Sequence, residues 1–130
     1  MDKTSLQSCA CPFVATLAVI GGKYKLEIVY YLFDRTLRYN QLAKLIKASP
    51  KMLAAQLKEL EDDGIINRTV YPVVPPKTEY SLTPLGNKLC ASVLEMYKFG
   101  QILFEVNGVK EPCSADNFTR LNKIMAELQK

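Results

Sequence analysis

The sequence contains no histidine, the residue that most often serves as general base or metal ligand in proteins. It also has no glycine-rich phosphate loop and no nucleophile beside an evident base. A catalytic constellation is therefore missing, and the pattern argues against an enzyme. We expect no catalytic residues and no cofactor.

Cysteine is scarce as well, with four in 130 residues. Cys9 and Cys11 have C-x-C spacing, and Cys90 and Cys113 stand alone, so we expect no structural metal site. No apolar run approaches the roughly 20 residues of a membrane span. The first eleven residues lack the apolar region of a signal peptide, which predicts a cytoplasmic protein with reactive or buried thiols in place of a disulfide framework.

The composition, 48% hydrophobic and 23% charged, is that of an ordinary globular protein, and we expect one domain over residues 1–130. The net charge of +4 is less informative than its distribution. Between Thr36 and Lys58 there is no acidic residue, whereas four acids follow within the next five positions. A basic stretch followed by acids suits a helix whose N-terminal half contacts phosphates. The alternative interpretation is that these charges form an ordinary solvent-exposed helix face. The basic residues of this stretch are Arg38, Lys44, Lys47, Lys51 and Lys58.

The most informative stretch predicts a helix that begins at Ser49-Pro50 and ends before Gly64. Serine is a good N-cap, proline suits the first turn, and glycine commonly follows the last helical residue. Leu53, Leu57 and Leu60 form one apolar stripe, as a core-facing helix requires. Small and basic side chains occupy the opposite face, which a DNA major groove can accept.

The segments on either side of this helix complete a motif. A helix over about residues 24–33 is expected earlier in the chain, with Lys25 pointing outward. A shorter helix starting at Tyr39, with Leu45 on its core face, directly precedes the recognition helix and is joined to it by a tight turn, as in a helix-turn-helix. Two β-rich segments follow, residues 65–71 and 78–82, joined by a proline-rich loop that would form a wing. We therefore predict a mainly α protein with a small β-hairpin (α+β), a winged helix-turn-helix whose DNA-reading part spans about residues 23–83.

Three further helices are predicted at about 12–20, 84–106 and 115–129. A single winged helix-turn-helix has little apolar surface left to cover the last two, so we expect these two to pair with a second subunit. The alternative is that they fold back on their own core. A homodimer would match a pseudo-palindromic operator in double-stranded DNA.

Four segments resemble the HxlR family of bacterial winged-helix regulators, which are relatives of the MarR-type repressors. They are CPFVATLAVIGGKYKLEIVYYL, LRYNQLAKLI, KMLAAQLKELEDDGII and RTVYPVVPPKTEYSLTPLG, and the similarity covers about Cys11 to Glu105. The resemblance implies a homodimeric transcription factor that reads DNA with the recognition helix and wing. It also implies dimer contacts from the first helix, at about residues 12–20, and from the C-terminal helices. One departure is Tyr24, where the family usually has tryptophan; we expect this to change packing more than function.

Seven residues are candidates for DNA contact. The lysines and the arginine are expected to bind phosphates or base edges, the serine to donate to a phosphate, and the alanines to permit close approach. Gln56, nearer the core edge, is a possible base reader. The alternative function is a winged-helix module that binds proteins without specific DNA binding. The candidates are Arg38, Ser49, Lys51, Ala54, Ala55, Lys58 and Lys77.

Cys11 is the candidate redox sensor. It falls at the N-cap of the helix that Pro12 opens, where free N–H groups and the helix dipole favour the thiolate. Several members of the family that the chain resembles sense quinones, aldehydes or oxidants through a cysteine at this position. The alternative is a small buried hydrophobe. Cys9 and Cys113 are possible partners or competitors, while Cys90 is expected in the core.

Overall fold

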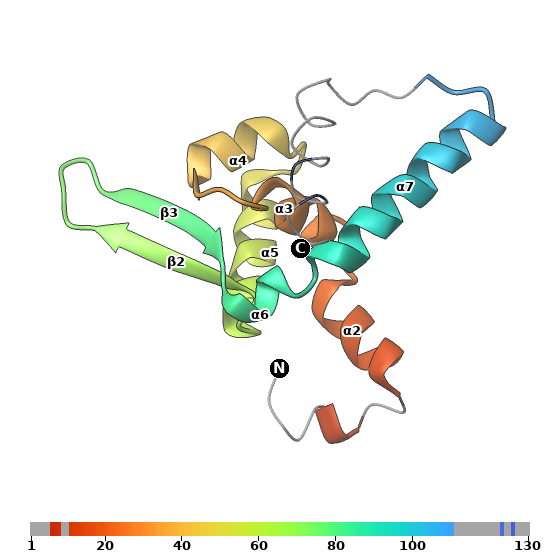
Figure 1. The fold of residues 1–130 in the computed structure, drawn as a ribbon. Coiled ribbons are helices and arrows are strands. Elements are labelled where there is room, and N and C mark those ends of the chain that lie inside the picture. Colours follow the sequence, from red (N-terminus) through yellow and green to blue (C-terminus); the bar gives the residue numbers. More distant parts are fainter. Residues whose placement is uncertain (1–5, 9–10, 111–122, 124–125, 127–130) are drawn as a thin grey trace. The chain divides into compact units, whose positions relative to one another are not determined.

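The computed structural model describes residues 6–8, 11–110, 123 and 126, and it separates into two compact units, residues 1–87 and 88–130. The first unit contains every helix and strand from α2 to α6 (Figure 1). The prediction of a single domain over residues 1–130 stays a prediction. The elements of the first unit are α2 (Pro12–Ile20), α3 (Lys25–Tyr31), β1 (Leu37–Arg38), α4 (Tyr39–Leu45), α5 (Pro50–Asp62), β2 (Ile66–Tyr71), β3 (Lys77–Leu82) and α6 (Pro84–Asn87).

The sheet has three antiparallel strands in the order β1-β3-β2. Tyr71 lies opposite Lys77 at the loop end of the hairpin, and Ile66 lies opposite Leu82 at its base. Figure 1 shows β2 and β3 extending beyond the group formed by α3, α4 and α5. The predicted class, mainly helical with a small β-hairpin in a winged helix-turn-helix, is confirmed, with β1 as an added edge strand.

The core of the first unit lies between α3, α4, α5 and the base of the sheet. The buried side chains of α5 are spaced three or four positions apart, as burial of one helix face requires. Leu45 was expected in this core but is 37% exposed, because α4 ends at Leu45 and Ile46 turns inward from an extended backbone. The completely buried side chains (at most 2% exposed) are Ile28, Val29, Leu32, Phe33, Leu42, Ile46, Leu53, Leu57, Leu60 and Ile66.

Thr83 joins the end of the hairpin to the end of α5. Its hydroxyl lies 2.6 Å from the carbonyl oxygen of Gly64 and 3.1 Å from that of Ile65, and it accepts from the N–H of Gly86 at 2.9 Å. A Cβ at Gly86 would lie 2.2 Å from the Ile65 carbonyl oxygen, so only glycine fits there without a shift. The sequence Thr83–Gly86 thus fixes where α6 begins against the wing.

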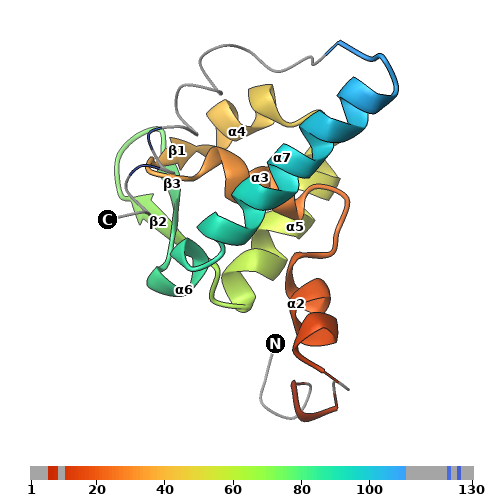
Figure 2. The same ribbon diagram turned by 45° about the vertical axis from the view of Figure 1, so that its right-hand side comes forward.

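The second unit contains α7 (Cys90–Val106), seen as one continuous helix in Figure 2. A single helix over residues 84–106 was predicted, and this is wrong, since Lys88 and Leu89 form a turn between α6 and α7. Gly86 and Asn87 are both poor helix formers, which favours an interruption at this point. The helix expected at 115–129 lies almost wholly outside the described residues.

Candidate nucleic-acid interface

The recognition helix α5 is closed at both ends by local hydrogen bonds. The Ser49 hydroxyl oxygen accepts from the N–H of Met52 at 3.1 Å, and Pro50 occupies the first turn. At the other end the N–H of Ile65 donates to the Leu60 carbonyl at 2.9 Å, and Gly64 takes a φ of 77°. This is the Schellman arrangement, which glycine accommodates without strain. The start and end predicted for this helix are confirmed.

The two faces of α5 differ sharply in exposure. Leu53, Leu57 and Leu60 are at most 2% exposed and form the buried stripe. Among the described side chains none forms an ion pair with Lys51, so its ammonium is available to an anion. The structure thus gives α5 an exposed face of small and basic side chains close to its N-terminus. That face consists of Lys51, Ala54, Ala55 and Lys58.

Gln56 points away from this face, which argues against its expected role as a base reader. A Cβ on Gly22 would lie 2.4 Å from the Gln56 Oε1, which is itself buried and receives no hydrogen bond from the described residues. The side chain therefore packs against the turn between α2 and α3. A larger residue at position 22 would require the end of the Gln56 side chain to shift.

Lys25 was expected to point outward, and this is wrong. It is 7% exposed, and its Nζ lies 2.7 Å from a carboxylate oxygen of Glu59, whose side chain is 54% exposed. A buried ammonium needs such a partner because removing it from water is costly. The pair connects α3 with α5 and helps to hold the recognition helix in place.

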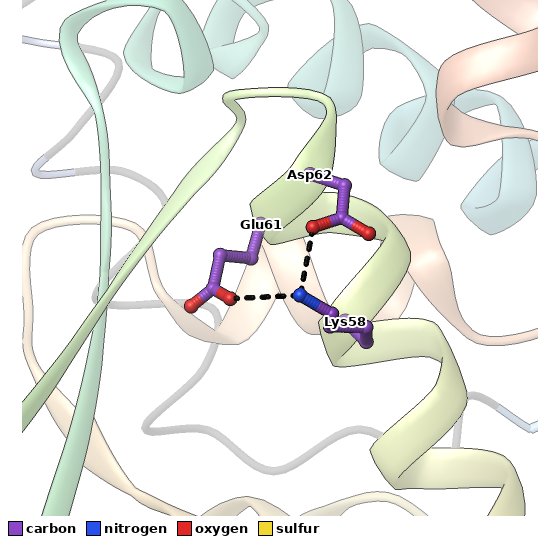
Figure 3. Close-up of polar contacts among 3 residues, drawn as sticks. All are labelled: Lys58, Glu61 and Asp62. Carbon is purple, nitrogen blue, oxygen red and sulfur yellow. Dashed lines mark hydrogen bonds and ion pairs between the residues drawn. The ribbon is translucent and has the colours of Figure 1, made fainter.

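Lys58 is held by two acids of its own helix (Figure 3). Its Nζ lies 3.0 Å from Asp62 Oδ1 and 3.7 Å from Glu61 Oε1. Asp62, and less strongly Glu61, raise the pKa of the Lys58 ammonium. The lysine side chain is 67% exposed, however, and exposed ion pairs of this kind are weak and screened by salt. Lys58 can therefore exchange these carboxylates for a phosphate at little cost.

Two candidates from distant parts of the sequence, Arg38 and Lys77, line one surface cavity of about 400 Å³. Arg38 precedes α4 on β1, and Lys77 begins β3, so the pairing of β1 with β3 brings them to the same region. Lys77 is also paired with Glu79 at 2.9 Å. The other residues lining the cavity are Tyr39, Asn40, Pro75, Pro76 and Thr78.

A second surface cavity, of about 330 Å³, contains a basic residue that sequence reasoning missed. Arg68 lies on β2 opposite Tyr80, and both line this cavity together with Lys58 of α5. The signal was present in the strand periodicity, because Arg68 is two positions after the buried Ile66 and shares its face of the sheet. Arg68 thus adds a positive charge between the recognition helix and the wing.

The cysteines divide into an exposed and a buried one among the described residues. Cys11 is exposed and occupies the N-cap of α2 with an extended backbone, as predicted, and its sulfur makes no capping hydrogen bond. Cys90 is buried, which confirms the core prediction, and burial raises the pKa of its thiol. Cys9 and Cys113 lie outside the described residues.

In the part of the chain that the structure describes, no helix is long and apolar enough to cross a membrane, and no group of three or more potential ligands is arranged for a metal ion.

Helix α4, the turn to α5, and the β2–β3 hairpin after it define a winged helix-turn-helix. Residues 19–107 match the family model of the HxlR-like helix-turn-helix. The chain belongs to this family and is a transcriptional regulator of the helix-turn-helix type.

Relatives and solved structures agree with this assignment. The chain is 48% identical over 102 residues to the HTH-type transcriptional regulator YdeP of Bacillus subtilis, covering 78% of this chain and 80% of YdeP. The redox regulator HypR in its oxidized form is 46% identical, with a TM-score of 0.67 over 70% of this chain and 95% of HypR. The reduced form of the regulator YodB from B. subtilis is 34% identical, with a TM-score of 0.61 over 70% of this chain and 91% of YodB.

Proposed function

We propose that the protein is a homodimeric regulator that binds a specific, pseudo-palindromic DNA operator, with α5 in the major groove and the β2–β3 wing on the adjacent backbone. The observation that carries this proposal is the exposed N-terminal half of α5. Its small side chains, Ala54 and Ala55, permit close approach, and Lys51 supplies a positive charge that no described side chain pairs with. Arg38 and Arg68 extend the positive surface toward the wing. Ser49, Lys58 and Lys77 are further candidates for phosphate contact.

Exposed apolar side chains support the homodimer. On α2, Phe13 is 80% and Leu17 is 60% exposed, and on α7, Phe99 is 61% and Val106 is 77% exposed. Leaving aromatic and aliphatic side chains in water on two helices is unfavourable, and a second copy of the chain would cover them. A two-fold dimer also presents two copies of α5, as two half-sites of an operator require.

An electrophoretic shift with the DNA upstream of the protein's own gene tests the proposal. Specific binding predicts a shift of this fragment at concentrations where a scrambled fragment of equal length stays free. The alternative, a winged-helix module that binds proteins only, predicts equal weak binding to both fragments. That second result, with a folded dimer confirmed by sedimentation, would refute the proposed function.

We also propose that Cys11 links oxidants or electrophiles to release of the operator. Cys11 is exposed at the N-terminus of α2, whereas Cys90 is buried and burial raises the pKa of its thiol. A modified Cys11 would displace α2, and movement at a dimer interface changes the spacing of the two α5 helices. Similarity to the redox regulator HypR supports this assignment.

Variants at three cysteines make the sensing proposal testable. Wild type, Cys11→Ser, Cys9→Ser and Cys90→Ala are treated with diamide or a quinone, and operator binding is measured before and after reduction. We expect all except Cys11→Ser to lose binding on treatment and to regain it on reduction after diamide. Unchanged binding by treated wild type, with thiol modification confirmed by mass spectrometry, would leave Cys11 with no sensing role. Loss in Cys11→Ser but not in Cys9→Ser would move the role to Cys9.

A further inference from the structure

The outer face of the wing places one acidic residue among the cations proposed to meet DNA. The register of the sheet sets Glu79 of β3 directly opposite Arg38 of β1 and opposite Thr69 of β2. Lys77 is two residues before Glu79 and therefore lies on the same face of the strand. Glu79 thus stands between the two cations that line the larger cavity, Arg38 and Lys77.

Both oxygens of the Glu79 carboxylate are engaged. Oε1 lies 2.9 Å from the Lys77 Nζ, and the Tyr71 hydroxyl donates to Oε2 at 3.3 Å. The Lys77 ammonium also lies 5.0 Å from the centre of the Tyr71 ring. The hydrogen bond from Lys77 is the main cause that lowers the pKa of Glu79, with smaller contributions from Tyr71 and Arg38, so Glu79 is charged at neutral pH.

This arrangement differs from the one around Lys58. The side chains of Lys77 and Glu79 are 33% and 20% exposed, whereas the Lys58 side chain is 67% exposed. Partial burial reduces screening by water and salt, so the pair on the wing is more persistent than the pair on α5. A phosphate entering the larger cavity meets Arg38 and Lys77, and Lys77 is held by Glu79, which does not itself line the cavity. To bind this phosphate, Lys77 must either leave Glu79 or stay beside the Glu79 carboxylate, whose negative charge repels the phosphate.

We propose, resting on the function proposed above, that Glu79 weakens binding of the wing to the DNA backbone by holding Lys77, and thereby sets the affinity of this protein for DNA. Backbone contacts provide nearly all of the binding to non-specific DNA. A carboxylate placed against them limits unproductive binding to random sequence. Glu79 therefore acts as an internal competitor of the phosphate for Lys77.

Fluorescence anisotropy with the labelled upstream fragment and with a scrambled fragment measures this effect over a range of salt concentrations. Glu79→Gln is expected to bind both fragments at least about fivefold more tightly at 0.1 M salt and to steepen the salt dependence by about 0.9 per subunit, since one more phosphate contact forms. Adding Lys77→Ala to Glu79→Gln is expected to remove this gain. The thermal midpoint of each variant shows that it is folded.

Two controls separate charge release from other causes. Tyr71→Phe removes a hydrogen bond to Glu79 but changes no charge. If the effect of Glu79→Gln came from a loosened wing, Tyr71→Phe would also change the affinity for DNA. The proposal predicts that Tyr71→Phe changes this affinity less than twofold. Glu95→Gln on α7 frees Lys98, its partner at 3.2 Å, with the same change in net charge, and is also expected to have less than a twofold effect.

Equal or weaker binding by Glu79→Gln, in an experiment where wild type prefers the upstream fragment, would overturn the proposal for Glu79 alone. An equal gain in Glu95→Gln, or a gain that persists without Lys77, would overturn it too. Wild type that shows no preference for the upstream fragment would instead count against the proposed function.

Discussion

Lys51 and Leu57 lie on the same helix, but their side chains have opposite surroundings. Leu57 is 2% exposed, and Leu57→Ala is expected to lower the free energy of unfolding by about 2–5 kcal/mol because it empties a core position. Lys51 is exposed, so Lys51→Ala should change stability by no more than about 0.5 kcal/mol while weakening operator binding. Thermal unfolding and anisotropy on both variants test this contrast. Normal operator binding by Lys51→Ala would remove this face of α5 from the interface.

Glu27 of α3 carries a pKa that partial burial raises above its ordinary value. The folded protein therefore binds a proton at Glu27 more tightly than the unfolded chain does. The resulting contribution to stability is present at low pH. It is lost as the pH rises from about 4.3, the usual pKa of glutamate, through the raised pKa of the folded state. Glu27→Gln is expected to raise the thermal midpoint at pH 7 and to leave it nearly unchanged at pH 4. A midpoint that Glu27→Gln lowers at pH 7 would show that the charged carboxylate stabilises the fold.

Single residues were predictable where their role depends on nearby sequence. Ser49 and Gly64 could be placed at the ends of α5 because caps act within a few residues. Lys25 could not be placed, because its burial depends on Glu59, which another helix brings to it. Arg68 was missed for a related reason, since strand register and the position of α5 together decide that it shares a cavity with Lys58.

At the scale of elements, Gly86 of α6 lies so close to the backbone at the base of the wing that a side chain has no room there. Gly86→Ala places a Cβ 2.2 Å from the Ile65 carbonyl oxygen, and we expect it to destabilise the protein by about 1–3 kcal/mol, because backbone must shift to admit it. Gly100→Ala on α7 is the matched control. A Cβ there meets nothing within 4 Å, and alanine is expected to be neutral or stabilising in a helix interior. Chemical denaturation measures the free energy of unfolding of both variants. Equal changes in Gly86→Ala and Gly100→Ala would contradict this explanation.

The elements that sequence reasoning placed correctly are those with strong local signals. Helix α2 begins at Pro12 and ends at Ile20 as predicted, and α5 follows its apolar stripe. The two-residue strand β1 was missed because only its pairing with β3 makes it a strand. The break between α6 and α7 was missed because Leu85, Leu89 and Val93 continue a helical spacing across it.

At the scale of the molecule, the protein has both a positively charged surface and exposed apolar helix faces. The positive residues of α5, β1 and β2 are proposed to face DNA, and exposed apolar residues of α2 and α7 are proposed to meet a second subunit. In the proposed dimer, two-fold symmetry doubles every phosphate contact, so DNA binding should depend on salt more steeply than one subunit allows. The sequence pattern predicted both surfaces, but it could not show that Glu79 and Asp62 partly neutralise the lysines.

The salt dependence of operator binding, measured by anisotropy on wild type and Lys51→Ala, tests the central claim that α5 and the wing bind DNA as a dimer. If each subunit contacts about three or four phosphates, log K should fall with log salt with a slope of about −5 to −7 for wild type. Lys51→Ala should reduce the magnitude of this slope by about 2 per dimer, because one contact is lost from each subunit. An affinity that does not change with salt, or an identical slope for the two proteins, would contradict the account.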